Sequence, residues 1–119
     1  MPDLTRTDVI KILAVTENAR LAGVDLSGLD LSSLNMSHAD LIRANLSHTN
    51  LTRAYLRGAT MEDANLEGAI LSYANLREAN LKGANLTNAV LTNAIMTDAN
   101  LFRAKLDGAQ TVGATGMTE

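Results

Sequence analysis

The segment from Ala64 to Leu86 reads ANLEGAILSYANLREANLKGANL, in which a central leucine, with alanine two positions before it, returns every five residues. On an α-helix, five residues turn the chain by about 500°, so leucines at this spacing would spiral over every face. On a β-strand, an odd spacing would place them alternately on the two faces. The pattern instead indicates a chain that turns by about 90° in each unit, so that four units close a coil of about 20 residues and every leucine points to one axis.

The five-residue register extends far beyond this segment, from Ala19 to Gly108, which makes 18 units or four and a half coils. The central position is leucine except at Met36, Met61 and Met96. The position two before it is alanine except at Val24, Leu29, Leu34 and Thr49. Three of these larger residues fall in the first full coil, so we expect that coil to have a wider gap to fill beside the N-terminal segment.

A short N-terminal segment lies outside the repeat. Thr5 and Asp8 have the spacing of a capping box, in which each side chain binds the backbone N–H of the other residue. Apolar residues at helical spacing follow, and we predict a helix from about Arg6 to Glu17. An amphipathic helix is a common cover for the exposed core at the end of a solenoid. We therefore interpret this helix as a cap rather than as a membrane-surface or partner-binding helix.

Length and composition place further bounds on the protein. We expect a single domain of 119 residues, in which residues 1–18 form the cap, 19–113 the repeat and 114–119 a tail. The net charge of −3, with both signs interspersed, is too weak to indicate nucleic-acid binding. The absence of cysteine excludes disulfides, thiol catalysis and cysteine-bound metal. No stretch resembles a membrane span or a signal peptide, so we expect a cytoplasmic protein.

Several units carry a resemblance to a known family. They are Ala44-Asn45-Leu46, Ala64-Asn65-Leu66, Ala79-Asn80-Leu81, Ala84-Asn85-Leu86 and Ala99-Asn100-Leu101. These units resemble the pentapeptide-repeat family, and the chain looks like a small member of the cyanobacterial type. The resemblance implies an all-β fold, a right-handed quadrilateral parallel β-helix lined by alanine and leucine ladders, and frequent dimers. One branch of the family resembles duplex DNA in shape and charge, binds DNA gyrase and protects it from quinolones. Many relatives place phenylalanine at the centre of some units, and this chain never does.

Residues that could carry chemistry do not come together in this pattern. His38 and His48 are ten residues apart, which places them on opposite sides of a coil of about 20 residues, where they cannot share a metal ion. No carboxylate pair faces a cleft, no serine or threonine has a His–Asp partnership, and the glycines of the repeat occupy turn positions rather than a phosphate-binding loop. We therefore expect no enzymatic activity, no metal and no cofactor.

The informative surface positions are those that break the Asn/Asp rule just before the central residue. They include Tyr55, Thr60, Ile70, Val90, Ile95 and Lys105. Ile70 and Val90 are 20 residues apart and should stack in one column, while Tyr55 and Ile95 share a column on the adjacent side. Tyr73 lies near the edge between the two columns. These residues predict an apolar strip of the kind that marks a protein-binding surface. The alternative is that β-branched and aromatic side chains simply suit a β surface.

Three further surface features follow from stacking residues 20 apart. Favourable charge pairs are expected for Glu62 with Lys82 and for Arg43 with Asp63, whereas Arg57 would lie beside Arg77. A hydroxyl column runs through Ser32, Thr52, Ser72 and Thr92. The neighbouring column is not a second hydroxyl array, which argues against ice binding.

The repeat decays past Gly108, and no second capping helix is visible. The last coil, with Leu101, Phe102 and Leu106, would then present an uncovered core and an unpaired edge. This end is a candidate for an end-to-end homodimer.

Two functions remain after these exclusions. The first is a non-enzymatic scaffold that binds an unidentified protein, and the alternative is a DNA-mimicking protein that binds gyrase, either to inhibit it or to protect it from quinolones. Mimicry requires a strongly negative surface, but residues 19–108 contain nine acidic and eight basic residues, a net charge of −1. We favour the scaffold, and we expect neither direct nucleic-acid binding nor membrane contact.

Overall fold

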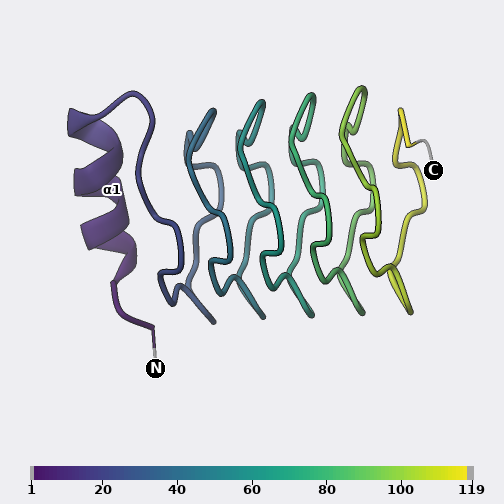
Figure 1. The fold of residues 1–119 in the computed structure, drawn as a ribbon, viewed down its shortest axis with the longest axis horizontal. Coiled ribbons are helices and arrows are strands. Elements are labelled where there is room, and N and C mark those ends of the chain that lie inside the picture. Colours follow the sequence, from purple (N-terminus) through teal and green to yellow (C-terminus); the bar gives the residue numbers. More distant parts are fainter. Residues whose placement is uncertain (1, 118–119) are drawn as a thin grey trace.

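The backbone from Arg20 to Thr115 is wound into stacked coils, joined by parallel β-bridges between residues that are 20 apart in the sequence (Figure 1). The structure, a computed structural model, describes residues 2–117. Each side of a coil contributes one bridged residue, which is too short for a regular strand. Residues 2–117 therefore contain isolated bridges rather than the continuous strands expected of an all-β protein. The coil length predicted from the five-residue period is confirmed.

Each side of a coil ends in a tight turn whose third residue has a positive φ angle. In the turn from Leu41 to Ala44, the Ala44 N–H donates to the Leu41 carbonyl over 3.0 Å, and Arg43 has a φ of 57°. This geometry is typical of a type II turn, which favours glycine at that position. Twelve of these residues are not glycine, among them His38 and Tyr73. The cost relative to glycine is roughly 1 kcal/mol for a residue other than asparagine or aspartate. In ten of the twelve, the backbone N–H donates to a carbonyl of the next coil and holds the turn in place.

The repeated asparagine or aspartate has a structural role in these turns. The Oδ1 atom of Asn45 accepts a hydrogen bond from the backbone N–H of Ser47 over 3.1 Å and another from the Ser47 hydroxyl over 2.7 Å. This arrangement, an Asx turn, satisfies a backbone donor that points away from the coil. The same backbone bond is accepted by Asp25, Asp30, Asn35, Asp40, Asn45, Asn50, Asn65, Asn75, Asn80, Asn85 and Asn100.

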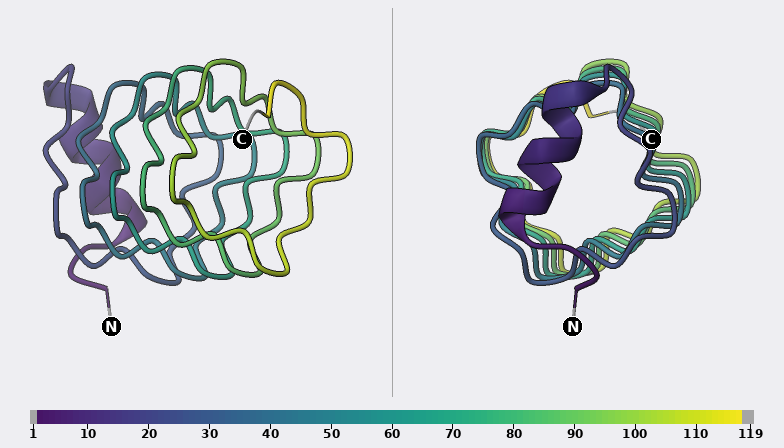
Figure 2. Two further views of the ribbon diagram at one scale, coloured as in Figure 1. Left: turned by 45° about the vertical axis from the view of Figure 1, so that its right-hand side comes forward. Right: turned by 90° about the vertical axis from the view of Figure 1, so that its left-hand side faces the viewer.

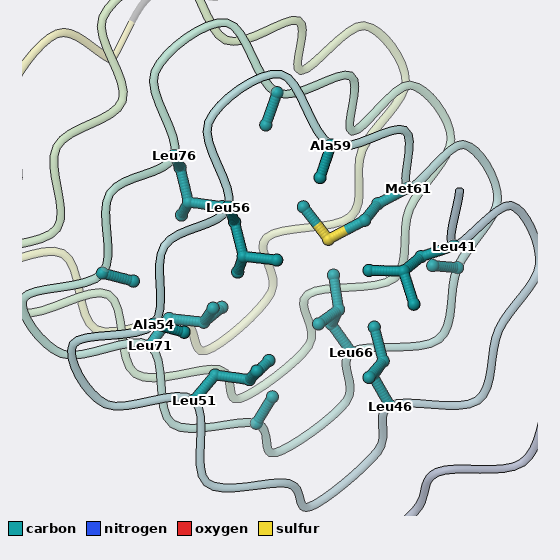
Figure 3. Close-up of a cluster of buried hydrophobic side chains, with 14 of the residues drawn as sticks. Leu41, Leu46, Leu51, Ala54, Leu56, Ala59, Met61, Leu66, Leu71 and Leu76 are labelled. Atoms are coloured by element: carbon teal, nitrogen blue, oxygen red, sulfur yellow. The ribbon is translucent and has the colours of Figure 1, made fainter. Parts of the chain in front are cut away.

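The core consists of inward-pointing leucine, methionine and alanine side chains that stack from coil to coil (Figure 3). Leu46 and Leu66, one coil apart, are both fully buried. Among residues 2–117, Thr49 is the one buried polar residue, and its hydroxyl donates to the Leu46 carbonyl over 2.7 Å. The threonine therefore occupies an alanine position without leaving an unsatisfied polar group.

The helix α1 (Arg6–Val15) lies across one end of the coils, as the view along their axis shows (Figure 2). It begins at Arg6 as predicted, with the capping box between Thr5 and Asp8, and ends at Val15 instead of Glu17. Val9 is fully buried, and Leu4, Ile12 and Leu13 pack on the core from the helix side. The three large residues of the first coil, Val24, Leu29 and Leu34, are partly buried and pack against the same core.

The N-terminal segment also satisfies the backbone edge of the first coil. The Asp3 N–H donates to the Asp25 carbonyl over 2.6 Å, and the Asp25 N–H donates to the Asp3 carboxylate over 2.9 Å. The Arg6 guanidinium donates to the carbonyls of Asp30 and Ser32 over 2.8 and 3.2 Å. Arg6 thus replaces the N–H donors that a preceding coil would supply. Within residues 2–117, α1 falls short of the length and hydrophobicity of a membrane-spanning helix.

Candidate protein-binding surface

The predicted apolar strip lies on two neighbouring sides of the coils and on the turn between them. Ile70 is bridged to Val90, so the two lie in adjacent coils on one side. Tyr55 and Ile95 lie on the next side, two coils apart, and both are bridged to Asn75. Tyr73 occupies the turn between the two sides, with a φ of 60°. The predicted columns are therefore present in the structure.

The five side chains of the strip differ in exposure. Tyr55 is 54% exposed, Tyr73 53% and Ile70 40%. Val90 and Ile95 are half-buried. The solvent-facing part of the strip is therefore made mainly by the two tyrosines and Ile70, with Val90 and Ile95 extending it toward the later coils.

The strip residues stand where most other units have an Asx turn. Ile70 and Val90 have no side-chain oxygen, and the backbone N–H groups of Ser72 and Thr92 have no acceptor among residues 2–117. The same holds for the N–H of Thr97, two residues after Ile95. At these positions an apolar side chain has replaced a hydrogen bond worth about 1 kcal/mol.

Arg53, which was not predicted to belong to the strip, contacts one of its tyrosines. The Arg53 guanidinium lies over the Tyr73 ring, 4.6 Å from its centroid, in a cation–π contact between adjacent coils. The two residues are 20 apart in the sequence, so this contact could have been predicted from the stacking of residues one coil apart. On the Tyr55 side, Arg57 Nε donates to Glu78 Oε1 over 2.9 Å. Glu78 is 21 positions further along, so this pair joins neighbouring columns rather than one column.

The predicted charge pairs are wrong. Among residues 2–117 the salt bridges are Arg6 with Asp30 and Arg57 with Glu78. Glu62 accepts a hydrogen bond from the Asn80 side chain over 3.3 Å instead of pairing with Lys82. Arg57 avoids Arg77 by turning to Glu78. Arg43 and Asp63 make no salt bridge within residues 2–117.

The two histidines lie on different units and face glycines of the next coil. His38 covers Gly58 and His48 covers Gly68, so closely that a Cβ on either glycine would meet the imidazole. In the described part of the chain, no group of three or more His, Cys, Asp or Glu side chains is arranged to hold a metal ion.

The last described coil is the second candidate surface. Leu101 and Leu106 are half-buried, in contrast to the fully buried leucines of the middle coils. Their backbone N–H groups have no acceptor among residues 2–117. Phe102 is 58% exposed, and its ring lies 5.2 Å from the Arg103 guanidinium.

Several solved structures are similar to this chain. A pentapeptide repeat protein from Nostoc Pcc 7120 is 28% identical, with 99% of this chain and 92% of that chain covered and a TM-score of 0.46. A pentapeptide repeat protein from the thylakoid lumen of Arabidopsis thaliana is 36% identical, with 74% and 65% covered and a TM-score of 0.43. Rfr23, a pentapeptide repeat protein from the cyanobacterium Cyanothece 51142, is 41% identical, with 82% and 60% covered and a TM-score of 0.42. The chain thus spans 60 to 65% of the length of these last two structures.

A search of the curated proteins gives no match. The family model of pentapeptide repeats matches in 8 copies, over residues 17–48, 35–72, 49–88 and 69–108. These matches cover the coils from the residues before the first bridge to the last leucine of the regular register. The chain belongs to the pentapeptide-repeat family.

Proposed function

We propose that the protein is a non-enzymatic scaffold, a right-handed quadrilateral β-helix in the cytoplasm, that binds a protein partner through Tyr55, Ile70, Tyr73, Val90 and Ile95. The observation that carries the proposal is the replacement of Asx turns by apolar residues in adjoining columns. At Ile70 and Val90 the outward residue neither caps the turn nor reaches the core.

The alternative explanation of the strip, that these residues suit a β surface, makes a different prediction. If these residues stabilised the coil, replacing Ile70 with asparagine would make the protein less stable. The hydrogen bonds at the equivalent Asn50 favour the opposite, since its side chain caps Thr52 through two bonds of 3.1 and 2.6 Å. A residue that lowers stability and exposes apolar surface is typical of a binding surface.

The test compares partner capture by matched variants. The I70N/V90N double variant removes the aliphatic column of the strip and restores the side chain that most units carry. The control T60N/K105N makes the same change at two positions outside the strip. Each protein is immobilised and exposed to a lysate of the organism that encodes it. We expect wild type and T60N/K105N to retain the same proteins and I70N/V90N to lose them. Equal capture by all three would refute the strip as the binding surface.

We also propose that the last coil joins two copies end to end, through Leu101, Phe102 and Leu106. The N–H groups of Leu101 and Leu106, which have no acceptor among residues 2–117, support this, because the backbone edge of the first coil is satisfied by Asp3 and Arg6. Light scattering should give a mass near 25 kDa, twice the 12.6 kDa of the chain, at micromolar concentration. A monomer mass throughout, or an L106D variant with an unchanged dimer mass, would contradict this interface.

A further inference from the structure

The outward residues of two adjacent coils form a basic and aromatic surface that overlaps the apolar strip. One coil contributes Arg53, Tyr55 and Arg57, and the next contributes Tyr73 and Arg77. We call these five residues the Arg–Tyr surface. Two contacts hold the adjacent coils side by side here. Arg53 stacks on Tyr73, and Tyr55 is bridged to Asn75.

This surface is positive on a protein that is negative overall. Residues 53–58 and 73–78 contain three arginines and one carboxylate, Glu78, whereas the whole chain has a net charge of −3. Glu78 pairs with Arg57 through the Arg57 Nε atom, at 2.9 Å from Glu78 Oε1. Arg77 makes no salt bridge within residues 2–117.

Two of the three arginines, Arg53 and Arg57, are held in place before any partner binds. The Arg53 guanidinium rests on the Tyr73 ring at 4.6 Å, and the salt bridge to Glu78 orients Arg57. A guanidinium held in this way loses less side-chain entropy when it binds a carboxylate through two parallel N–H donors. Tyrosine and arginine are also the residues enriched at the energetic centre of protein interfaces.

We propose that the Arg–Tyr surface binds an acidic protein segment, in which carboxylates alternate with apolar side chains. The carboxylates would meet Arg53, Arg57 and Arg77, and the apolar side chains would meet the tyrosines and Ile95. This assignment rests on the proposed function, because it names the partner chemistry of the same surface. Charge complementarity between this surface and the acidic segment supports the assignment, because it sets the specificity of an interface.

The same geometry disfavours a single-stranded nucleic acid. Stacking of a base needs an open aromatic face, and one face of Tyr73 is covered by Arg53. Attraction of a polyanion also needs an extended positive field, and residues 19–108 carry a net charge of −1.

The test measures fluorescence anisotropy with a fluorescein-labelled (Glu-Leu)6 peptide as the probe. The charge-reversed (Lys-Leu)6 peptide and labelled dT20 are the comparison probes. The variants are R53N, R57Q and R77Q, and asparagine at position 53 tolerates its φ of 59°. The control R43N makes the same change at the same turn position, with a φ of 57°, and K82Q matches R57Q and R77Q in its place within the unit.

We expect the (Glu-Leu)6 peptide to bind wild type, R43N and K82Q alike, and to bind each variant of the Arg–Tyr surface roughly tenfold more weakly. (Lys-Leu)6 should not bind. Thermal melts followed by circular dichroism verify that every variant is folded.

Three results would overturn the inference. Absence of (Glu-Leu)6 binding at about 1 mM peptide is one, since weaker affinity carries no specific recognition. Binding of dT20 that depends on the same arginines would assign the surface to nucleic acid instead. Peptide binding that survives R53N, R57Q and R77Q but is lost in I70N/V90N would show a partner recognised by apolar contacts alone. That last result leaves the proposed function intact. Equal protein capture by wild type and I70N/V90N would refute the proposed function whatever the peptide does.

Discussion

The Asn50 side chain accepts two hydrogen bonds from Thr52, one from its backbone N–H over 3.1 Å and one from its hydroxyl over 2.6 Å. Ile70, bridged to Asn50 in the next coil, precedes Ser72 in the same arrangement but has no oxygen to offer. The two positions therefore form a matched pair. We expect N50I to lower the free energy of unfolding by about 1 kcal/mol, and I70N to leave it unchanged or raise it by up to about 1 kcal/mol. Urea unfolding of the two variants measures both effects. A larger loss of stability in I70N than in N50I would show that Ile70 serves the coil.

Gly28 isolates the effect of the turn conformation. It has a φ of 72°, and a Cβ built on it would meet nothing within 4 Å. G28A should lower the free energy of unfolding by about 1 kcal/mol through the backbone alone. G28N should lower it by only a few tenths, because asparagine tolerates positive φ. Equal losses in thermal melts of G28A and G28N would contradict this account of the turns.

Acid should loosen the capped end before the middle coils. The hydroxyl and N–H of Ser32 lower the pKa of Asp30, the side chain and N–H of Ser27 lower the pKa of Asp25, and the N–H and hydroxyl of Thr5 lower the pKa of Asp8. A carboxyl group with a lower pKa in the folded state than in the unfolded state stabilises the fold above its unfolded value of about 4. This stabilisation is lost as the pH falls through the lower folded values. The middle coils use asparagine in the same role, which does not titrate in this range.

The measurement for this prediction is amide hydrogen exchange at several pH values below about 4. The amides of α1 and the first coil should lose protection at a higher pH than those of residues 60–90. D25N/D30N should reduce the difference, since the amide keeps the turn without the titration. Simultaneous loss of protection along the whole chain would be evidence against a separate acid response of the cap.

Gyrase offers a test of the alternative function. The interspersed charges and the Arg–Tyr surface argue against a DNA mimic, so we expect no inhibition of DNA supercoiling by purified gyrase at micromolar concentrations of this protein. The same assay with a quinolone present should show no protection. Inhibition that persists in R53N/R57Q/R77Q would establish mimicry by another side of the coils.

The period of the sequence was sufficient to predict the coil, its inward leucines and the columns of the strip, because the inward positions of a solenoid recur at a fixed interval. The capping box predicted the start of α1, since Thr5 and Asp8 bind each other locally. The positive φ of His38 and Tyr73 was not predicted, although both residues occupy the unit position at which Gly58 and Gly68 stand in other units. The pair of Arg57 and Glu78 was also missed. Stacking predicts contacts only between residues 20 apart, whereas these two flexible side chains are 21 apart and meet across neighbouring columns.

The bridge between residues 20 apart has a consequence for how such a chain can change in length. Insertion or deletion of one five-residue unit leaves every leucine pointing inward, but it rotates all later outward residues by a quarter turn relative to the earlier ones. If the changed unit lies between Arg53 and Tyr73, the two residues no longer meet, although the core is intact. Only insertions or deletions of 20 residues preserve both the core and the alignment of the outward columns. A recombined chain can thus keep its fold and acquire a new surface in a single step. Such an event changes which outward residues are neighbours, and therefore what the surface can bind.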